Sequence, residues 1–174
     1  GAGTTLTESM AHGCSFSGTD INPLAILICE AKSAVFLTQE LDLKANSVLN
    51  RILTDSSRTI DVSFPGRSKW FSRRNAIRLS RIRRAIQKEP SDWARKIMWV
   101  IFAETIRKTS NARTSTYKLH IRPLEDLATL PDPLQVFRHE LLEAVGRFRY
   151  HEELLKSKGL LNHGRYCAKT ELRC

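Results

Sequence analysis

An α/β fold with a large α-helical insertion is predicted for this 174-residue chain, and three observations support it. A glycine turn, a short helix and a short strand follow one another within the first 19 residues. Between residues 37 and 159 the apolar side chains recur mainly at helical spacing. The last 15 residues, 160–174, can then return to the first strand. We expect three parts, 1–36, 37–159 and 160–174, of which the first and last share one sheet.

Residues 1–20 have the order expected of a nucleoside-binding unit. Gly1 and Gly3 allow backbone angles that a Cβ would resist, and they let a ligand approach the main chain. Thr4 or Thr5 can cap a helix whose first N–H groups face an electronegative ligand. The following strand brings Asp20 to its carboxyl end, where an acid commonly accepts hydrogen bonds from a ribose. A structural turn and a helix-capping Asp20 are the alternative.

Local signals place the other elements. Gly13 is expected to end the first helix, and Asn22 to cap a second helix that begins at Pro23. The apolar face of that second helix should pack on the sheet, and its residues are Leu24, Leu27, Ile28, Ala31 and Val35. Three more helices are expected over residues 37–53, 92–109 and 134–158, the second of them central and buried. A strand over residues 165–172 would return the chain to the sheet.

The net charge favours a polyanionic partner. The 28 Lys and Arg residues against 18 Asp and Glu residues give a formal charge of +10. The chain shows no signal peptide and no apolar run long enough to cross a bilayer, which indicates neither secretion nor a membrane. Nucleic acid is then the partner that this charge favours. A basic surface kept for solubility is the alternative.

The cysteines and histidines show no metal-binding pattern. Cys14, Cys29, Cys167 and Cys174 lack Cys-x-x-Cys spacing, and the five histidines include no pair at metal-ligand spacing. We therefore expect reduced thiols, no metal site and a cytoplasmic location.

A basic helix is the candidate nucleic-acid contact. Residues 67–84 contain eight Lys and Arg residues and no acid. On a helical wheel Leu79, Ile82 and Ile86 share one face, and the opposite face carries Arg74, Arg78, Arg81 and Arg84. Such a row of guanidinium groups suits phosphates and would add salt-dependent affinity without reading sequence. A solvated charged face is the alternative.

Two segments carry a family resemblance. Gly-x-Gly-Thr-Thr-Leu-x-Glu at residues 1–8 and Gly-x-Asp-Ile-Asn-Pro-Leu-Ala at residues 18–25 resemble the S-adenosylmethionine-binding half of DNA amino-methyltransferases. These enzymes methylate the exocyclic nitrogen of adenine or cytosine. The resemblance implies a partial Rossmann-like methyltransferase sheet and S-adenosyl-L-methionine as cofactor. The implied cofactor-binding residues are Gly1, Ala2, Gly3, Thr4, Thr5, Asp20, Ile21 and Asn22.

A second match concerns the nucleic acid. Ser-Asn-Ala-Arg at residues 110–113, followed by Tyr-Lys-Leu at 117–119, resembles a Ser-Asn-x-Arg…Phe-Lys-Leu segment in one branch of that family. With the basic helix it implies double-stranded DNA as the partner. The candidate DNA-binding residues are Arg73, Arg74, Arg78, Arg81, Arg84, Asn111, Arg113 and Lys118.

The family's catalytic segment is not found in this sequence. That segment reads Asp/Asn/Ser-Pro-Pro-Tyr/Phe and binds a flipped base, whereas this chain contains no Pro-Pro. The family's Asp-Pro-Phe, which precedes the glycine loop, is also missing. We therefore assign no catalytic residue and expect a chain that is inactive alone. It would be a fragment of a longer protein or one subunit of a split enzyme, with the remaining catalytic half as its partner.

Two functions of different classes stay open at the sequence level. The first is the cofactor-binding part of a DNA methyltransferase. The second is a non-enzymatic, basic helical module that binds nucleic acid and keeps a degenerate nucleotide fold. A nucleotide-dependent oxidoreductase is disfavoured, because the third glycine of the dinucleotide fingerprint is missing.

Overall fold

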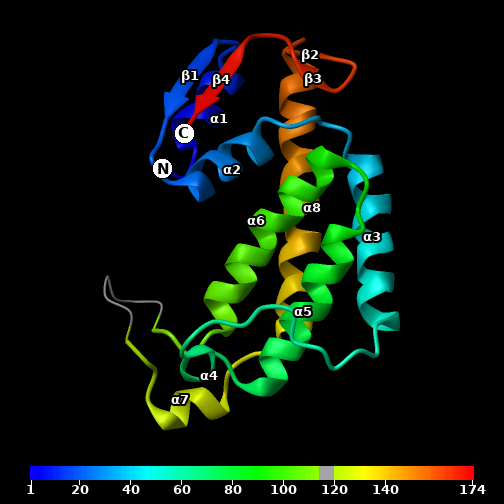
Figure 1. Cartoon of the computed structure of the whole chain (residues 1–174). Helices are drawn as coiled ribbons and strands as arrows, with labels where there is room; N and C mark the ends of the chain where they lie inside the picture. Colours follow the sequence, from blue (N-terminus) through cyan, green and yellow to red (C-terminus); the bar gives the residue numbers. More distant parts are fainter. Residues whose placement is uncertain (114–119) are drawn as a thin grey trace.

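A two-stranded parallel sheet lies at one end of a bundle of long helices (Figure 1). The structure, a computed structural model, describes residues 1–113 and 120–174. Strand β1 (Phe16–Thr19) pairs in parallel with β4 (Thr170–Arg173), so that Phe16 lies opposite Thr170 and Thr19 opposite Arg173. Parallel neighbours need a crossover connection, and the helical part of the chain supplies it. A wider, Rossmann-like sheet stays a prediction.

Helix α1 (Thr4–Ala11) begins directly after the glycine loop. Its N-cap residue is Gly3, which has a φ of 72° and provides no side-chain cap. The expectation that Thr4 or Thr5 caps this helix is therefore wrong, because the left-handed Gly3 already turns the chain into the helix and both threonines lie in its first turn. The expected end is confirmed, since Gly13 follows the helix with a φ of 71°.

Helix α2 (Pro23–Lys32) has the expected cap and a different buried face. Asn22 Oδ1 accepts a hydrogen bond from the backbone N–H of Leu24 at 3.0 Å, which confirms the cap. Leu24 itself is 42% exposed, whereas Ala25 and Cys29 are buried. The predicted face is wrong in this respect because α2 packs mainly on helix α6 (Asp92–Thr109), and the sheet is too narrow to cover it.

Four long helices enclose the main core. They are α3 (Thr38–Thr54), α5 (Arg73–Gln87), α6 and α8 (Pro133–Ser157). Their expected positions are confirmed. The buried side chains between them include Leu41, Val48, Ile52, Leu79, Ile82, Ile86, Ile97, Met98, Ile101, Phe137, Leu141 and Val145.

A smaller cluster joins the sheet end to the bundle. Its buried members are Leu6, Met10, Cys29, Phe36 and Leu155. After α8 the chain forms a short antiparallel hairpin of β2 (Leu161–Asn162) and β3 (Arg165–Tyr166) before it reaches β4. The expected single strand over residues 165–172 is therefore wrong, because the chain turns back on itself at residues 163–164 and pairs locally first.

Glu152 of α8 holds the start of α3. Its carboxylate accepts a hydrogen bond from the backbone N–H of Thr38 (2.9 Å) and pairs with Lys156 (2.5 Å). Burial alone would raise the pKa of Glu152, but the hydrogen bonds from Lys156 and Thr38 outweigh it and lower that pKa below its ordinary value of 4.5. A lowered folded-state pKa means that the contact stabilises the fold above about pH 4.5 and is lost as the pH falls further.

Glu152→Ala is expected to lower the free energy of unfolding by about 1–3 kcal/mol at neutral pH, because the buried Thr38 N–H loses its acceptor. Urea unfolding followed by circular dichroism measures the change. Glu153→Ala, at the exposed neighbouring position, is the matched control and should cost less than about 0.5 kcal/mol. Equal effects of the two variants would contradict this role of Glu152.

Candidate cofactor loop and nucleic-acid interface

The glycine loop and the acid of the first strand meet at the carboxyl end of β1. The amino group of Gly1 contacts the carboxylate of Asp20, and the backbone N–H of Asn22 donates to Asp20 Oδ1 at 2.9 Å. Asp20 is thus held as a charged acceptor beside the loop.

Gly3 fits closely against helix α2. A Cβ at this position would lie 3.1 Å from Cys29 Sγ and 3.4 Å from Lys32 Cδ, and the φ of 72° already disfavours any side chain. The Lys32 ammonium donates to the carbonyl oxygen of Ala2 at 2.5 Å. The loop therefore has a fixed path over α2 that only glycine can follow.

The remaining predicted cofactor residues border the same edge. Thr4 and Thr5 are exposed in the first turn of α1, and no side chain of the described residues caps that turn. Its N–H groups therefore remain open to an electronegative ligand. Ile21, next to the acid, is 95% exposed, which leaves an apolar surface beside Asp20. The side-chain oxygen of Asn22 is already used as a cap.

This arrangement combines donors, a charged acceptor and an apolar contact. The helix start offers N–H groups, Asp20 offers carboxylate oxygens to hydroxyl groups, and Ile21 offers a surface to a flat ring. A cavity of about 700 Å³ lies elsewhere, between α1, α2, α6 and α8. It is mostly apolar and its lining does not include residues 1–3 or Asp20. The candidate cofactor site is therefore an open edge.

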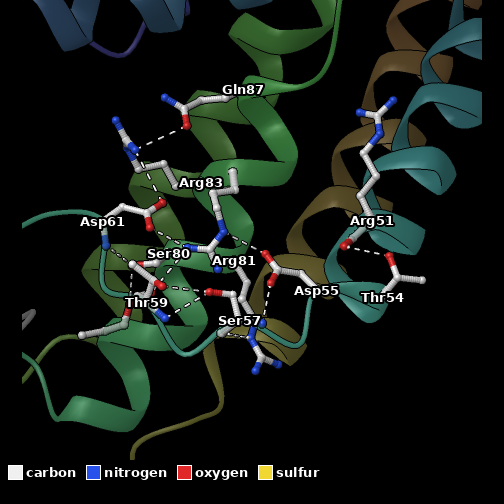
Figure 2. Close-up of polar contacts among 12 residues, drawn as sticks. Arg51, Thr54, Asp55, Ser57, Thr59, Asp61, Ser80, Arg81, Arg83 and Gln87 are labelled. Atoms are coloured by element: carbon white, nitrogen blue, oxygen red, sulfur yellow. Dashed lines mark hydrogen bonds and ion pairs between the residues drawn. The ribbon is translucent and has the colours of Figure 1, made fainter.

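A strap of polar residues covers one side of the basic helix. Residues 55–61, here called the acidic strap, cross α5 (Figure 2). Arg84 of α5 lies between two carboxylates, with Nε 2.9 Å from Asp55 and Nη1 2.5 Å from Asp61. Arg83 pairs with Asp61 at 3.6 Å, and Arg81 Nε donates to the carbonyl oxygen of Ser57 at 3.0 Å.

The strap contacts shift the pKa values of both partners. The hydrogen bond from Arg84 is the main reason why the pKa of Asp55 lies below its ordinary value of 3.8, and the bond to Asp55 likewise raises the pKa of Arg84. The backbone N–H of Asp61 also donates to the Ser80 hydroxyl of α5 at 3.1 Å. The Arg84 guanidinium is therefore paired with the carboxylates of the strap at neutral pH.

The five arginines predicted on α5 thus fall into two groups. Arg81 and Arg84 face the strap, and Arg78 pairs with Asp132, the N-cap residue of α8, at 2.7 Å. Arg73 and Arg74 are exposed and form no ion pair within residues 1–113 and 120–174. Phosphate contact by the first group stays a prediction. For Arg78 and Arg84 it would require the carboxylates of Asp132, Asp55 and Asp61 to be displaced.

The second predicted segment lies beside the start of the basic helix. Asn111 donates from its backbone N–H to the carbonyl oxygen of Trp70 (2.8 Å) and from Nδ2 to that of Lys69 (3.0 Å). Both acceptors belong to the short helix α4 (Arg67–Trp70), which precedes α5. Arg113 is exposed, and Lys118 lies outside the described residues.

One basic end of the bundle results. Figure 1 shows α4, the start of α5 and the end of α6 gathered at the lower end, beside the short helix α7 (Leu124–Ala128) and away from the sheet. The structure therefore brings Arg73 and Arg74 near the segment with Asn111 and Arg113. It also adds Lys69, which lies in the basic run of the sequence but was not among the predicted contacts.

Neither a metal centre nor a membrane span is found in the described part of the chain. Residues 1–113 and 120–174 contain no group of three or more His, Cys, Asp or Glu side chains placed to hold a metal ion. None of their helices is both long and apolar enough to cross a membrane.

Comparison with known proteins supports a relation to DNA methyltransferases. The chain is similar to the Type II methyltransferase M.MvaI of Kocuria varians, with 28% identity over 181 aligned positions. The alignment covers 98% of this chain and 38% of that relative, so the chain spans less than two fifths of the relative's length. No family model matches the sequence, and no solved structure matches it.

Proposed function

We propose that this chain is the cofactor-binding part of a site-specific DNA methyltransferase that moves a methyl group from S-adenosyl-L-methionine to an exocyclic base nitrogen. The observation that carries the proposal is the meeting of the glycine loop with Asp20 at the carboxyl end of β1. The similarity to a Type II methyltransferase supports the same class. We further propose a cytoplasmic restriction-modification setting.

The residues of the open edge would each hold a different part of the cofactor. Asp20 would accept hydrogen bonds from the ribose hydroxyls, and Ile21 would cover one face of the adenine ring. The loop from Gly1 to Thr5 would bring the first N–H groups of α1 against the electronegative groups of the cofactor. When bound, S-adenosylmethionine supplies an already activated methyl group, so positioning is the main task left to the protein.

The basic end of the bundle would hold double-stranded DNA. Arg73 and Arg74 are exposed there, and Arg113 lies on the neighbouring segment. Guanidinium groups suit phosphate oxygens, and such contacts would fix the orientation of the duplex without reading its sequence. The acceptors for the target amine would come from the Pro-Pro-containing segment of the remaining catalytic half, because this chain contains no Pro-Pro.

The chain is expected to bind S-adenosylhomocysteine but to transfer no methyl group by itself. Isothermal titration calorimetry measures the binding. Incubation with tritiated S-adenosylmethionine and DNA, followed by counting of the recovered DNA, measures the transfer. Incorporation above the level of the Asp20→Ala variant would contradict the proposal that the catalytic segment lies outside this chain.

The acidic strap gives a test of the DNA-binding surface. Asp55→Asn combined with Asp61→Asn should release Arg83 and Arg84 for phosphate contact. We expect DNA affinity to rise several-fold and the slope of log K against log salt to steepen by about one to two. Fluorescence anisotropy with a labelled duplex at several salt concentrations measures both.

A control with the same charge change separates this effect from net charge. Glu40→Gln combined with Asp42→Asn removes two acids from α3, and neither forms an ion pair in the described part of the chain. This control should change affinity by less than about twofold, because more distant exposed charges are largely screened. An equal gain in both double variants would show that the strap does not compete with phosphates.

A non-enzymatic nucleic-acid-binding module is the second candidate. The exposed pair of Arg73 and Arg74 favours it as much as it favours the first. Under this alternative the chain binds DNA but not S-adenosylhomocysteine. The calorimetric titration therefore separates the two candidates directly.

A further inference from the structure

Asn111 connects three segments at the basic end of the bundle. Its backbone N–H donates to Trp70 O (2.8 Å) and its side-chain Nδ2 to Lys69 O (3.0 Å). Its own carbonyl oxygen accepts a hydrogen bond from the backbone N–H of Arg122 (2.8 Å). The side chain thus acts on the backbone of α4, which lies about 40 residues earlier in the chain.

Helix α4 depends on such external contacts. It is a single turn of four residues, none of them fully buried. A helix this short is not stable by itself, because ordering its first turn loses more conformational entropy than the hydrogen bonds of one turn can offset. Gly66 precedes it with a φ of 78°, and Phe71 follows it in an extended conformation and packs on the core. The hydrogen bonds from Asn111 therefore hold the end of α4 between Gly66 and Phe71.

Lys69 is presented by this turn. Its ammonium lies 5.1 Å from the centre of the Trp70 ring, and the side chain is exposed. It forms no ion pair within residues 1–113 and 120–174. A cation over an indole face keeps its charge and is partly ordered by the ring. The orientation of this charge follows from the backbone that Asn111 holds.

The charges next to Lys69 in the sequence have the same sign. Residues 67–74 contain four Lys and Arg residues and no acid, and the first turn of α5 likewise contains no acid. Arg73 and Arg74 stand at that first turn, where the helix dipole is itself positive. Such an accumulation is unfavourable in the free protein and would be relieved by a polyanion.

We propose that Asn111 is a positioning residue: its side chain holds the backbone of Lys69 so that Lys69 joins Arg73 and Arg74 in one phosphate-binding surface. The proposal rests on the proposed function, in which the basic end binds DNA. It adds Lys69 as a phosphate contact, and it gives the Asn111 amide a role within the protein instead of a direct contact with DNA. Its Nδ2 already donates to Lys69 O.

A double-mutant cycle tests this role. Lys69→Ala should weaken binding to a labelled duplex about three- to tenfold and reduce the salt slope by about one. Asn111→Ala should give most of the same loss and the same change of slope. Adding Asn111→Ala to Lys69→Ala should cost little more, because the two residues act through one contact. Asn46→Ala, at an exposed position of α3, is the matched control and should bind like the parent chain.

The outcomes separate this inference from the proposed function. Additive losses, or a loss at Asn111 without a change in salt slope, would indicate direct contact and overturn the positioning role. Binding unaffected by Lys69→Ala would overturn the inference as well. Circular dichroism checks that the Asn111→Ala variant keeps the helix content of the parent chain. If this variant is folded and its DNA affinity is unchanged, the positioning role of Asn111 is overturned. The proposed function, and this inference with it, would instead be refuted by either of two results. One is that the parent chain does not bind DNA, and the other is that Arg73→Ala combined with Arg74→Ala leaves DNA affinity unchanged.

Discussion

Asp20→Ala is expected to abolish detectable binding of S-adenosylhomocysteine, a loss of at least about a hundredfold. The carboxylate is the charged acceptor at the carboxyl end of β1, because a partly exposed Asp carboxyl is ionised at neutral pH. Alanine removes both oxygen atoms that would bind the ribose hydroxyls. Isothermal titration calorimetry of the parent and the variant measures the change.

Two controls decide what the Asp20 result means. Asp42→Ala removes an acid from α3, far from β1 in the sequence, and should leave cofactor affinity unchanged. Fluorescence anisotropy of Asp20→Ala with a DNA duplex should give the parent affinity, because the basic end lies away from the sheet. Binding of S-adenosylhomocysteine that survives Asp20→Ala would contradict the proposed site. No binding by the parent would favour the non-enzymatic module.

Arg73→Ala combined with Arg74→Ala is expected to weaken DNA binding about tenfold to a hundredfold. Each lost guanidinium–phosphate contact should cost on the order of tenfold and reduce the slope of log K against log salt by about one. These two arginines can act without first breaking an internal pair, since none is formed with the described residues. A titration at three or more salt concentrations gives both quantities.

A charge-matched pair elsewhere on the surface is the control for that result. Arg149→Ala combined with Arg165→Ala removes two exposed cations, one from the last turns of α8 and one from β3, at the sheet end of the molecule (Figure 1). We expect a change of less than about threefold, since these residues contribute only to the long-range field. Equal losses in the two double variants would indicate binding through net charge alone. The basic end would then not be a distinct surface.

The helical framework could be predicted from the sequence because its signals are local. The apolar spacing of residues 79–86 gave the buried face of α5, and the same pattern placed α3, α6 and α8. Asn22 before Pro23 predicted the start of α2, and Gly13 predicted the end of α1. Each signal acts over one or two turns, so no distant segment had to be known.

The start of α1 and the last strands were less predictable. Two threonines after Gly3 suggested a side-chain cap, whereas the positive φ of Gly3 made one unnecessary. The stretch from Arg165 to Leu172 read as one strand, but it divides because its first residues pair with a local hairpin partner. In both cases the sequence pattern was compatible with two conformations, and the conformation of the neighbouring backbone decided between them.

The partners of the arginines required the tertiary structure. A helical wheel places Arg78, Arg81 and Arg84 on the solvent side of α5, and that placement does not show what lies over them. Arg84 contacts Asp55, 29 positions earlier, and Arg78 contacts Asp132 of another helix. The sequence does show two acids, Asp55 and Asp61, in the loop before the basic helix. Only the path of that loop over α5 shows that they pair with its arginines.

The glycine loop, the acid after β1 and the long helices were determined by the sequence itself. Periodicity and capping act between near neighbours, and they specify these elements before the chain folds. Only the tertiary structure decided which basic residues pair with acids of the described residues and that Asn111 supports Lys69, across 42 positions of sequence. A charged side chain takes whichever partner the fold brings within reach, and the strength of that contact falls steeply with distance and exposure to water.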